Sequence, residues 1–172
     1  SHQRVMVIEV MGHKAGWIAL HSGMAGGGDI ILLPELEYNI RNIGNTIIER
    51  LKKGKTYSIV VVAEGIKTAD GKKAAEYIAQ EVEYETGFET RETVLGYIQR
   101  GGAPTPFDRN LATRMGGYAT QMIATGQFGR MVALQGDKIG SVPLEEVAGK
   151  LKLVNEDHDL IIQGKQMGVC FG

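Results

Sequence analysis

Two arginines flank a short apolar segment near the middle of the chain. Residues 93–98 have the sequence TVLGYI, with Arg91 before them, Arg100 after them, and Gly101 and Gly102 next. An arginine guanidinium can contact a phosphate through two parallel hydrogen bonds, and a glycine lets a ligand approach the backbone closely. The segment therefore predicts a strand whose flanking arginines suit an oxyanion. Two surface arginines beside a core strand would give the same spacing.

Polar residues and glycines also follow two other apolar runs. Met11, Gly12 and His13 come directly after the first run, and Glu64 and Gly65 come directly after the third. In an open α/β sheet, ligands lie beyond the carboxyl ends of the strands. A carboxylate there accepts hydrogen bonds from hydroxyl groups, and a glycine at a helix start exposes backbone N–H groups to an anion. Together with the two arginines, these residues suit an anionic polyol. A sugar phosphate fits them better than a nucleobase or an apolar ligand.

The elements that must position these residues alternate between strand and helix. Continuous apolar runs predict buried strands, and apolar residues three or four positions apart predict helices. Strands are expected at residues 5–10, 29–34, 57–63, 93–98 and 131–134. Helices are expected at residues 14–24, 40–53, 70–83 and 145–150, and another begins after Thr105, where Pro106 and Asp108 suit the first turn. This alternation predicts an α/β fold with a parallel sheet layered by helices.

The composition is that of an ordinary globular protein. The 172 residues are 43% hydrophobic and 23% charged, and a net charge of −1 gives no indication of a nucleic-acid or membrane partner. The single cysteine, Cys170, allows no disulfide within the chain, which fits a reducing cytoplasm. No apolar run is long enough to cross a bilayer. We therefore expect a cytoplasmic protein.

Three segments resemble the 6-phosphofructokinase family. They are residues 4–28 (RVMVIEVMGHKAGWIALHSGMAGGG), residues 60–65 (VVVAEG) and residues 89–109 (ETRETVLGYIQRGGAPTPFDR), and they occur in the family's order and at its spacing. The resemblance implies a two-lobe α/β enzyme whose chain crosses between the lobes near residues 104–106. We expect a sugar-phosphate-binding lobe at residues 1–102. Residues 103–172 would be the C-terminal part of the second lobe and a tail.

The resemblance also implies that several residues bind fructose 6-phosphate: Arg4, Met11, Gly12, His13, Glu64, Arg91, Tyr97 and Arg100. Glu64 matches the acid that holds the fructose hydroxyls. Tyr97 and Arg100 match residues that bind the 6-phosphate. Arg4 and Arg91 match arginines that reach into the substrate site of a neighbouring subunit, which implies a homo-oligomer, either a tetramer or a dimer.

Two residues depart from the family's pattern. His13 stands where the family usually has an arginine that stabilises charge on the transferring phosphoryl group, so either His13 is protonated or Lys14 reaches in. Tyr97 stands where histidine is common. A tyrosine donates one hydrogen bond but carries no charge. These two replacements would alter turnover.

A third set of residues matches parts of the family's allosteric nucleotide site: Gly27, Gly28, Asp29 and Lys55. Asp29 would take the place of an acid near an effector Mg²⁺. A tight turn and a solvated lysine explain the same residues equally well.

The function that the resemblance implies is phosphoryl transfer in glycolysis, from ATP with Mg²⁺ to the 1-hydroxyl of fructose 6-phosphate. The family's phosphate-donor site and catalytic aspartate lie upstream of the matched segments, so this chain is expected to be a C-terminal portion that is inactive alone. Two alternatives stay open. One is a pyrophosphate-dependent phosphofructokinase, and the other is a sugar-phosphate-sensing module without catalysis.

Overall fold

The computed structural model describes residues 4–69 and 71–172, which form two units. The first unit contains residues up to 100 together with residues 152–172, and the second contains Gly101–Leu151. We predicted instead that residues 103–172 would be the C-terminal part of the second lobe and a tail. The last residues belong to the first unit because Val154, Ile161 and Phe171 are buried in its hydrophobic core.

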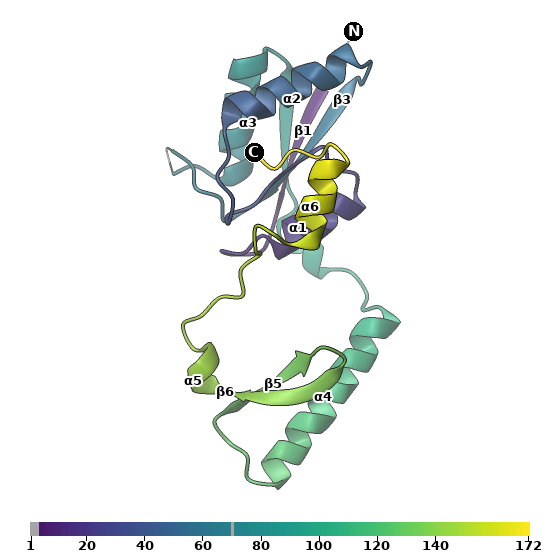
Figure 1. Cartoon of the computed structure of the whole chain (residues 1–172), viewed down its shortest axis with the longest axis vertical. Helices are drawn as coiled ribbons and strands as arrows, with labels where there is room; N and C mark the ends of the chain where they lie inside the picture. The colour runs from purple at the N-terminus through teal and green to yellow at the C-terminus, as the bar shows by residue number, and fades with distance from the viewer. Residues whose placement is uncertain (1–3, 70) are drawn as a thin grey trace. The chain divides into compact units, whose positions relative to one another are not determined.

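The first unit is built on a parallel sheet, as predicted. Its strands are β1 (Arg4–Val10), β2 (Ile30–Leu32), β3 (Tyr57–Ala63) and β4 (Glu89–Val94), in the order β2-β3-β1-β4. Figure 1 shows the central pair, β1 and β3, side by side. The predicted strands at residues 5–10 and 57–63 are confirmed to within one residue. Strands in the middle of a sheet that is covered on both faces are apolar at nearly every position, and β1 and β3 have such sequences.

Helices cover both faces of this sheet. They are α1 (Trp17–Ala25), α2 (Ile40–Lys52), α3 (Ala74–Thr86) and α6 (Asp159–Gln166). Helix α2 packs beside α3. Helix α1 packs beside α6, which belongs to the C-terminal tail, residues 152–172 (Figure 1). Gly23 of α1 lies against Ile31 on one face of the sheet, whereas the first turn of α3 binds Glu9 on the other face. The tail also reaches the sheet directly, because Ile31 donates a backbone hydrogen bond to Cys170.

The prediction of a strand at residues 93–98 was wrong. The strand β4 begins earlier, at Glu89, and a 3₁₀ helix, η1 (Gly96–Arg100), follows it. Gly96 has a φ of +52°, which ends the extended backbone at this point. Arg91 therefore lies inside β4, and Arg100 is the last residue of η1.

Helices α1 and α3 begin later than we predicted. Helix α1 starts at Trp17, after a turn at residues 13–14 in which His13 has a φ of +55°. Helix α3 starts at Ala74, and the predicted start at residue 70 lies outside the described residues. Strand β2 is shorter than predicted, ending at Leu32, just before Pro34.

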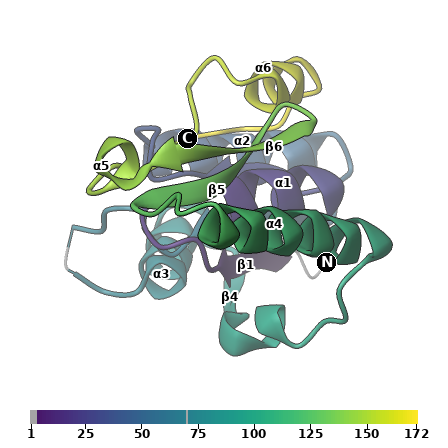
Figure 2. The same ribbon diagram turned by 90° about the horizontal axis from the view of Figure 1, so that it is seen from below.

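The second unit contains one long helix and a hairpin. Its elements are α4 (Pro106–Ala124), β5 (Arg130–Gln135), β6 (Lys138–Pro143) and α5 (Leu144–Val147). The predicted start of α4 is confirmed by a capping box, in which Thr105 and Asp108 each bind the other's backbone N–H. The strand β6 was not predicted. It pairs antiparallel with β5 beside α4 through the turn at Gly136, whose φ is +64° (Figure 2). The second unit therefore has a small antiparallel sheet and not a parallel one.

Within the described part of the chain, no helix is both long enough and apolar enough to span a membrane.

Candidate functional site

The loops that follow β1 and β3 meet at the carboxyl edge of the sheet. These two strands are neighbours, and the helices that follow them, α1 and α3, leave over opposite faces. Such a topological switch point leaves a crevice between the strand ends, where α/β proteins bind ligands. The predicted residues that follow both strands therefore lie at the expected place.

Glu64 fastens the two loops to each other. Its Oε1 atom accepts a hydrogen bond from the backbone N–H of Gly12 at 3.0 Å and another from that of His13 at 2.6 Å. Every hydrogen bond between Glu64's carboxylate and the described residues ends on this one oxygen. The second oxygen, Oε2, is left to accept a hydrogen bond from a ligand, since the side chain is exposed.

The conformation of the loop at residues 11–13 depends on two glycines, Gly12 in the loop itself and Gly65 in the loop after β3. A Cβ atom on Gly12 would lie 2.6 Å from the carbonyl oxygen of Ala15, and one on Gly65 would lie 2.1 Å from that of His13. Both distances are far below van der Waals contact, so a side chain at either position would displace the loop. The glycine in the VVVAEG segment is thus required by the close approach of the two loops.

The helix η1 supplies the third side of the site. Tyr97 and Arg100 are three residues apart in a 3₁₀ helix, so they project from the same side. The guanidinium carbon of Arg100 lies 5.7 Å from the centre of the Tyr97 ring, in a cation–π contact. Both side chains are exposed and accessible to an anion.

Sequence reasoning missed Gln99. Its Oε1 accepts a hydrogen bond from the backbone N–H of Met11 at 2.8 Å, which ties η1 to the loop after β1. The available signal was a polar amide between Tyr97 and Arg100, two predicted site residues. It was overlooked because this part of the chain was predicted to be a strand.

Glu35 was missed as well. Both of its carboxylate oxygens accept the backbone N–H of Gly16, at 2.9 and 3.1 Å, where α1 begins. Its Oε1 also accepts the N–H of Val154 in the tail at 3.0 Å. Glu35 follows β2, so the rule that selected Glu64 after β3 would have selected it too.

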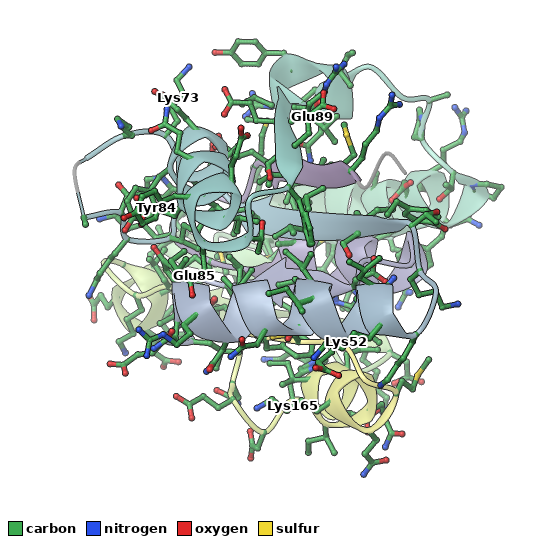
Figure 3. The ribbon with its side chains drawn as sticks, turned by 90° about the horizontal axis from the view of Figure 1, so that it is seen from above. Lys52, Lys73, Tyr84, Glu85, Glu89 and Lys165 are labelled. Atoms are coloured by element: carbon green, nitrogen blue, oxygen red, sulfur yellow. The ribbon has the colours of Figure 1, made fainter. Side chains whose placement is uncertain are left out.

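Arg4 and Arg91 lie apart from this site within the chain. Arg4 is the first residue of β1 and Arg91 pairs with Met6, whereas the loop begins after Val10. At about 3.3 Å per residue, Arg4 is on the order of 20 Å from the end of β1. Arg91 instead forms an exposed ion pair with Glu89 of β4 at 2.6 Å, and Figure 3 shows Glu89 on this strand.

The residues assigned to the allosteric site also lie at the amino ends of the strands. Gly27 and Gly28 form the turn before β2. Asp29 accepts the N–H of Ile59 at 2.9 Å and pairs with the Arg50 guanidinium at 2.7 Å, one carboxylate oxygen for each. Within the described residues, both oxygens of Asp29 thus already have a protein partner. Lys55 lies just before β3, where its backbone N–H donates to the carbonyl oxygen of Arg50.

Comparison with known proteins identifies the class. The chain belongs to the phosphofructokinase family, whose model, described as "Phosphofructokinase", matches residues 1–123. A relative from Bacteroides thetaiotaomicron named ATP-dependent 6-phosphofructokinase 3 is 81% identical over the whole chain, which covers 51% of that relative. A relative from Streptomyces coelicolor named pyrophosphate–fructose 6-phosphate 1-phosphotransferase is 43% identical, again over the whole chain and 54% of the relative.

Solved structures agree with this family. The crystal structure of a pyrophosphate-dependent phosphofructokinase from Nitrosospira multiformis matches the whole chain with a TM-score of 0.79 and 26% sequence identity, and the match covers 46% of that chain. The present chain thus spans about half the length of the curated relatives it matches.

Proposed function

We propose that this chain provides the fructose 6-phosphate half of a 6-phosphofructokinase. The complete enzyme would transfer a phosphoryl group from ATP to the 1-hydroxyl of fructose 6-phosphate, giving fructose 1,6-bisphosphate in glycolysis. The observation that carries the proposal is the set of hydrogen bonds at the switch point. Glu64 accepts the backbone N–H groups of Gly12 and His13, and Gln99 of η1 accepts that of Met11. The family membership and the name of the Bacteroides relative support it.

Each part of the site has a proposed role toward the sugar phosphate. The free Oε2 of Glu64 accepts a fructose hydroxyl, because Oε1 is already held by the loop. Arg100 makes a two-point contact with the 6-phosphate, and the Tyr97 hydroxyl donates one more hydrogen bond to it. Met11 and Gly12 line the sugar. This arrangement positions the 1-hydroxyl for transfer, and positioning is a major part of catalysis in phosphoryl transfer.

His13 is the residue of this chain that we place nearest the transferring phosphoryl group. It follows Gly12 in the loop and its side chain is exposed, so it can reach a bound anion. A protonated imidazole at this position would stabilise the negative charge that develops during transfer. Lys14, the next residue, is also exposed and is the other candidate for this role.

Mg²⁺ is expected with the phosphate donor. In the described residues, no group of three or more histidine, cysteine, aspartate or glutamate side chains is arranged to hold a metal ion. Because Mg²⁺ in kinases is usually held by substrate phosphates and one or two carboxylates, we place it with the donor and outside this chain's own residues. Asp29 remains the candidate for a separate effector Mg²⁺, in an allosteric site with Gly27, Gly28 and Lys55.

We further propose that the enzyme is a cytoplasmic homo-oligomer, a tetramer or a dimer. Arg4 and Arg91 are too far along their strands to reach the site of their own chain. Both side chains are exposed, so they are available to a second copy of the chain. In a symmetric oligomer each chain would receive these arginines from its neighbour.

A pyrophosphate-dependent enzyme is the second candidate function. It is favoured by the names of the Streptomyces relative and the Nitrosospira structure. The residues of this chain would bind the same sugar phosphate in either case, so the donor is decided elsewhere. The replacement of the usual family residues by His13 and Tyr97 is the observation that favours a sensing module without catalysis.

A joined enzyme tests whether this chain supports phosphoryl transfer to fructose 6-phosphate. In it, this chain replaces the matching residues of the Bacteroides thetaiotaomicron relative. We expect fructose 1,6-bisphosphate from fructose 6-phosphate and MgATP, and binding of fructose 6-phosphate without turnover would establish a sensing module. Because the relative supplies the donor half, the second candidate needs a second joined enzyme, in which the Streptomyces coelicolor relative supplies that half and pyrophosphate is the donor. The isolated chain should form no product, and product from it would show that the donor half is not needed.

A further inference from the structure

Gln99 occupies a position between the two predicted phosphate-binding residues, but its side chain points elsewhere. Tyr97 and Arg100 are exposed, whereas Gln99 is half-buried and its Oε1 accepts the N–H of Met11 at 2.8 Å. These partners are 88 residues apart in sequence. Gln99 therefore connects η1 to a different loop and is not free for an anion in the way that its neighbours are.

The loop at residues 11–13, called the substrate loop below, is held from two sides. The N–H groups of Met11, Gly12 and His13 all donate to side-chain oxygens, the first to Gln99 and the other two to Glu64. His13 has a left-handed backbone conformation, which is unfavourable for a residue other than glycine. Two side chains from distant segments therefore impose the shape of this loop.

The helix η1 has few other attachments. Its backbone is joined to β4 through Leu95, whose N–H donates to the carbonyl oxygen of Glu9 at 3.1 Å. The N–H of Ile98 donates to the carbonyl oxygen of Leu95 at 3.3 Å. The hydrogen bond from Met11 to Gln99 is the one link between the η1 residues and the β1 loop among the hydrogen bonds of the described residues. Without it, η1 could shift relative to Glu64.

We propose that Gln99 is a positioning residue that sets the span between Arg100 and Glu64, and thereby selects the length of the sugar phosphate. This inference rests on the proposed function, in which Arg100 holds the phosphate and Glu64 holds the hydroxyls at the other end of the sugar. A hexose 6-phosphate fits the span when η1 is tied to the loop. A sugar phosphate that is one carbon longer does not fit. Its kcat/KM relative to that of the hexose phosphate therefore rises when the hydrogen bond between Met11 and Gln99 is lost.

The test uses the joined enzyme and two substrates, fructose 6-phosphate and sedoheptulose 7-phosphate. Gln99→Met keeps the side chain's size but removes the acceptor. One neutral hydrogen bond is worth about 0.5–1.5 kcal/mol, so kcat/KM for fructose 6-phosphate should fall about two- to tenfold, mainly through KM. For sedoheptulose 7-phosphate it should change less than about twofold. The control is Ile98→Met, an exposed neighbour in η1, which should leave both values unchanged.

A merely structural role for Gln99 would lower kcat/KM for both sugars by the same factor, and that result, or no change with either sugar, would overturn the proposal. A second measurement does not depend on turnover. In the 172-residue chain, Gln99→Met should speed hydrogen exchange of the Met11 amide and leave those of Gly12 and His13 protected by Glu64. Unchanged exchange at Met11 would refute the positioning contact. An inactive joined enzyme with normal Gln99 would instead count against the proposed function, and the exchange measurement would still decide the role of Gln99.

Discussion

Replacing Arg100 by alanine tests the phosphate site most directly. Arg100 ends η1 with its guanidinium exposed beside Tyr97, so alanine removes the charge and its donors without opening a cavity in the core. Hydrogen bonds to charged groups are worth about 1.5–3 kcal/mol, which is roughly a ten- to hundredfold change in affinity. The cation–π contact with Tyr97 is worth about 0.5–1 kcal/mol at an exposed position, so the phosphate contact dominates.

Steady-state kinetics of the joined enzyme measure this effect. Arg100→Ala should raise the KM for fructose 6-phosphate by roughly ten- to hundredfold and leave the KM for the donor almost unchanged. Arg100→Lys should recover only part of the affinity, since lysine lacks the planar guanidinium. Tyr97→Phe keeps the ring and removes the hydroxyl. It should raise the KM for fructose 6-phosphate less than Arg100→Ala does, because it removes one hydrogen bond but no charge.

An exposed arginine on another helix provides the matched control. Arg41→Ala on α2 should change neither KM. If Arg100→Ala binds fructose 6-phosphate as the parent does, or if the loss falls on the donor, then Arg100 is not the phosphate ligand and the role of η1 is wrong.

Three further predictions concern assembly, the substrate loop and helix α4. Mixing joined enzymes that carry Arg91→Ala and Arg100→Ala should restore activity above either parent, because some sites in the mixed oligomer receive both arginines intact. Gly65→Ala should lower the free energy of unfolding by about 1–3 kcal/mol in a denaturant titration and raise the KM for fructose 6-phosphate, since its Cβ would meet a loop carbonyl at 2.1 Å. Hydrogen bonds from the Thr105 side chain, then from its backbone, hold the pKa of Asp108 below its ordinary 3.8. Their contribution is present above that pH and is lost as the pH falls through the lowered pKa, so the protection factors of the amides in the first turn of α4, which compare exchange with the intrinsic rate at the same pH, should fall below about pH 3.8.

Each of these has a control that sharpens it. Mixed oligomers that form but recover no activity would refute the shared site. Gly116→Ala, at an exposed helical position with open space around it, should raise the free energy of unfolding by about 0.4–1 kcal/mol. If both Gly65→Ala and Gly116→Ala lower the free energy of unfolding, the effect does not come from the close contact at Gly65. In Asp108→Ala, the protection factors in the first turn of α4 should no longer fall with pH. If they still fall, the effect belongs to another titratable group.

The parts of the fold that depend on local pattern could be predicted. The strands at 5–10 and 57–63 are apolar at nearly every position because both faces of the sheet are covered, and that signal needs no knowledge of their partners. The start of α4 is also local, since Thr105 and Asp108 bind each other's backbone within one turn. The hairpin β5–β6 was missed although its signal, a glycine at the turn, was present.

The site was predictable in outline for a similar reason. In a parallel sheet all strands end at the same edge, so residues after β1 and β3 had to lie at that edge. The strand order then placed them side by side, because β1 and β3 are neighbours. That rule selected Gly12, His13 and Glu64, which the structure joins by hydrogen bonds. The assignment of each residue to a sugar phosphate came from the resemblance to a family and stays a prediction.

The sequence alone thus determined the central strands β1 and β3, the edge where ligands bind and the residues that follow these two strands there, because these depend on neighbours along the chain. Only the tertiary structure decided which backbone groups each side chain holds. The bond from Met11 to Gln99, the pairing of Asp29 with Arg50 and the return of the tail to Glu35 all join segments that are far apart in sequence. Such contacts depend on the exact end of β4, the register of the sheet and the packing of the tail, and no local pattern of residues records them.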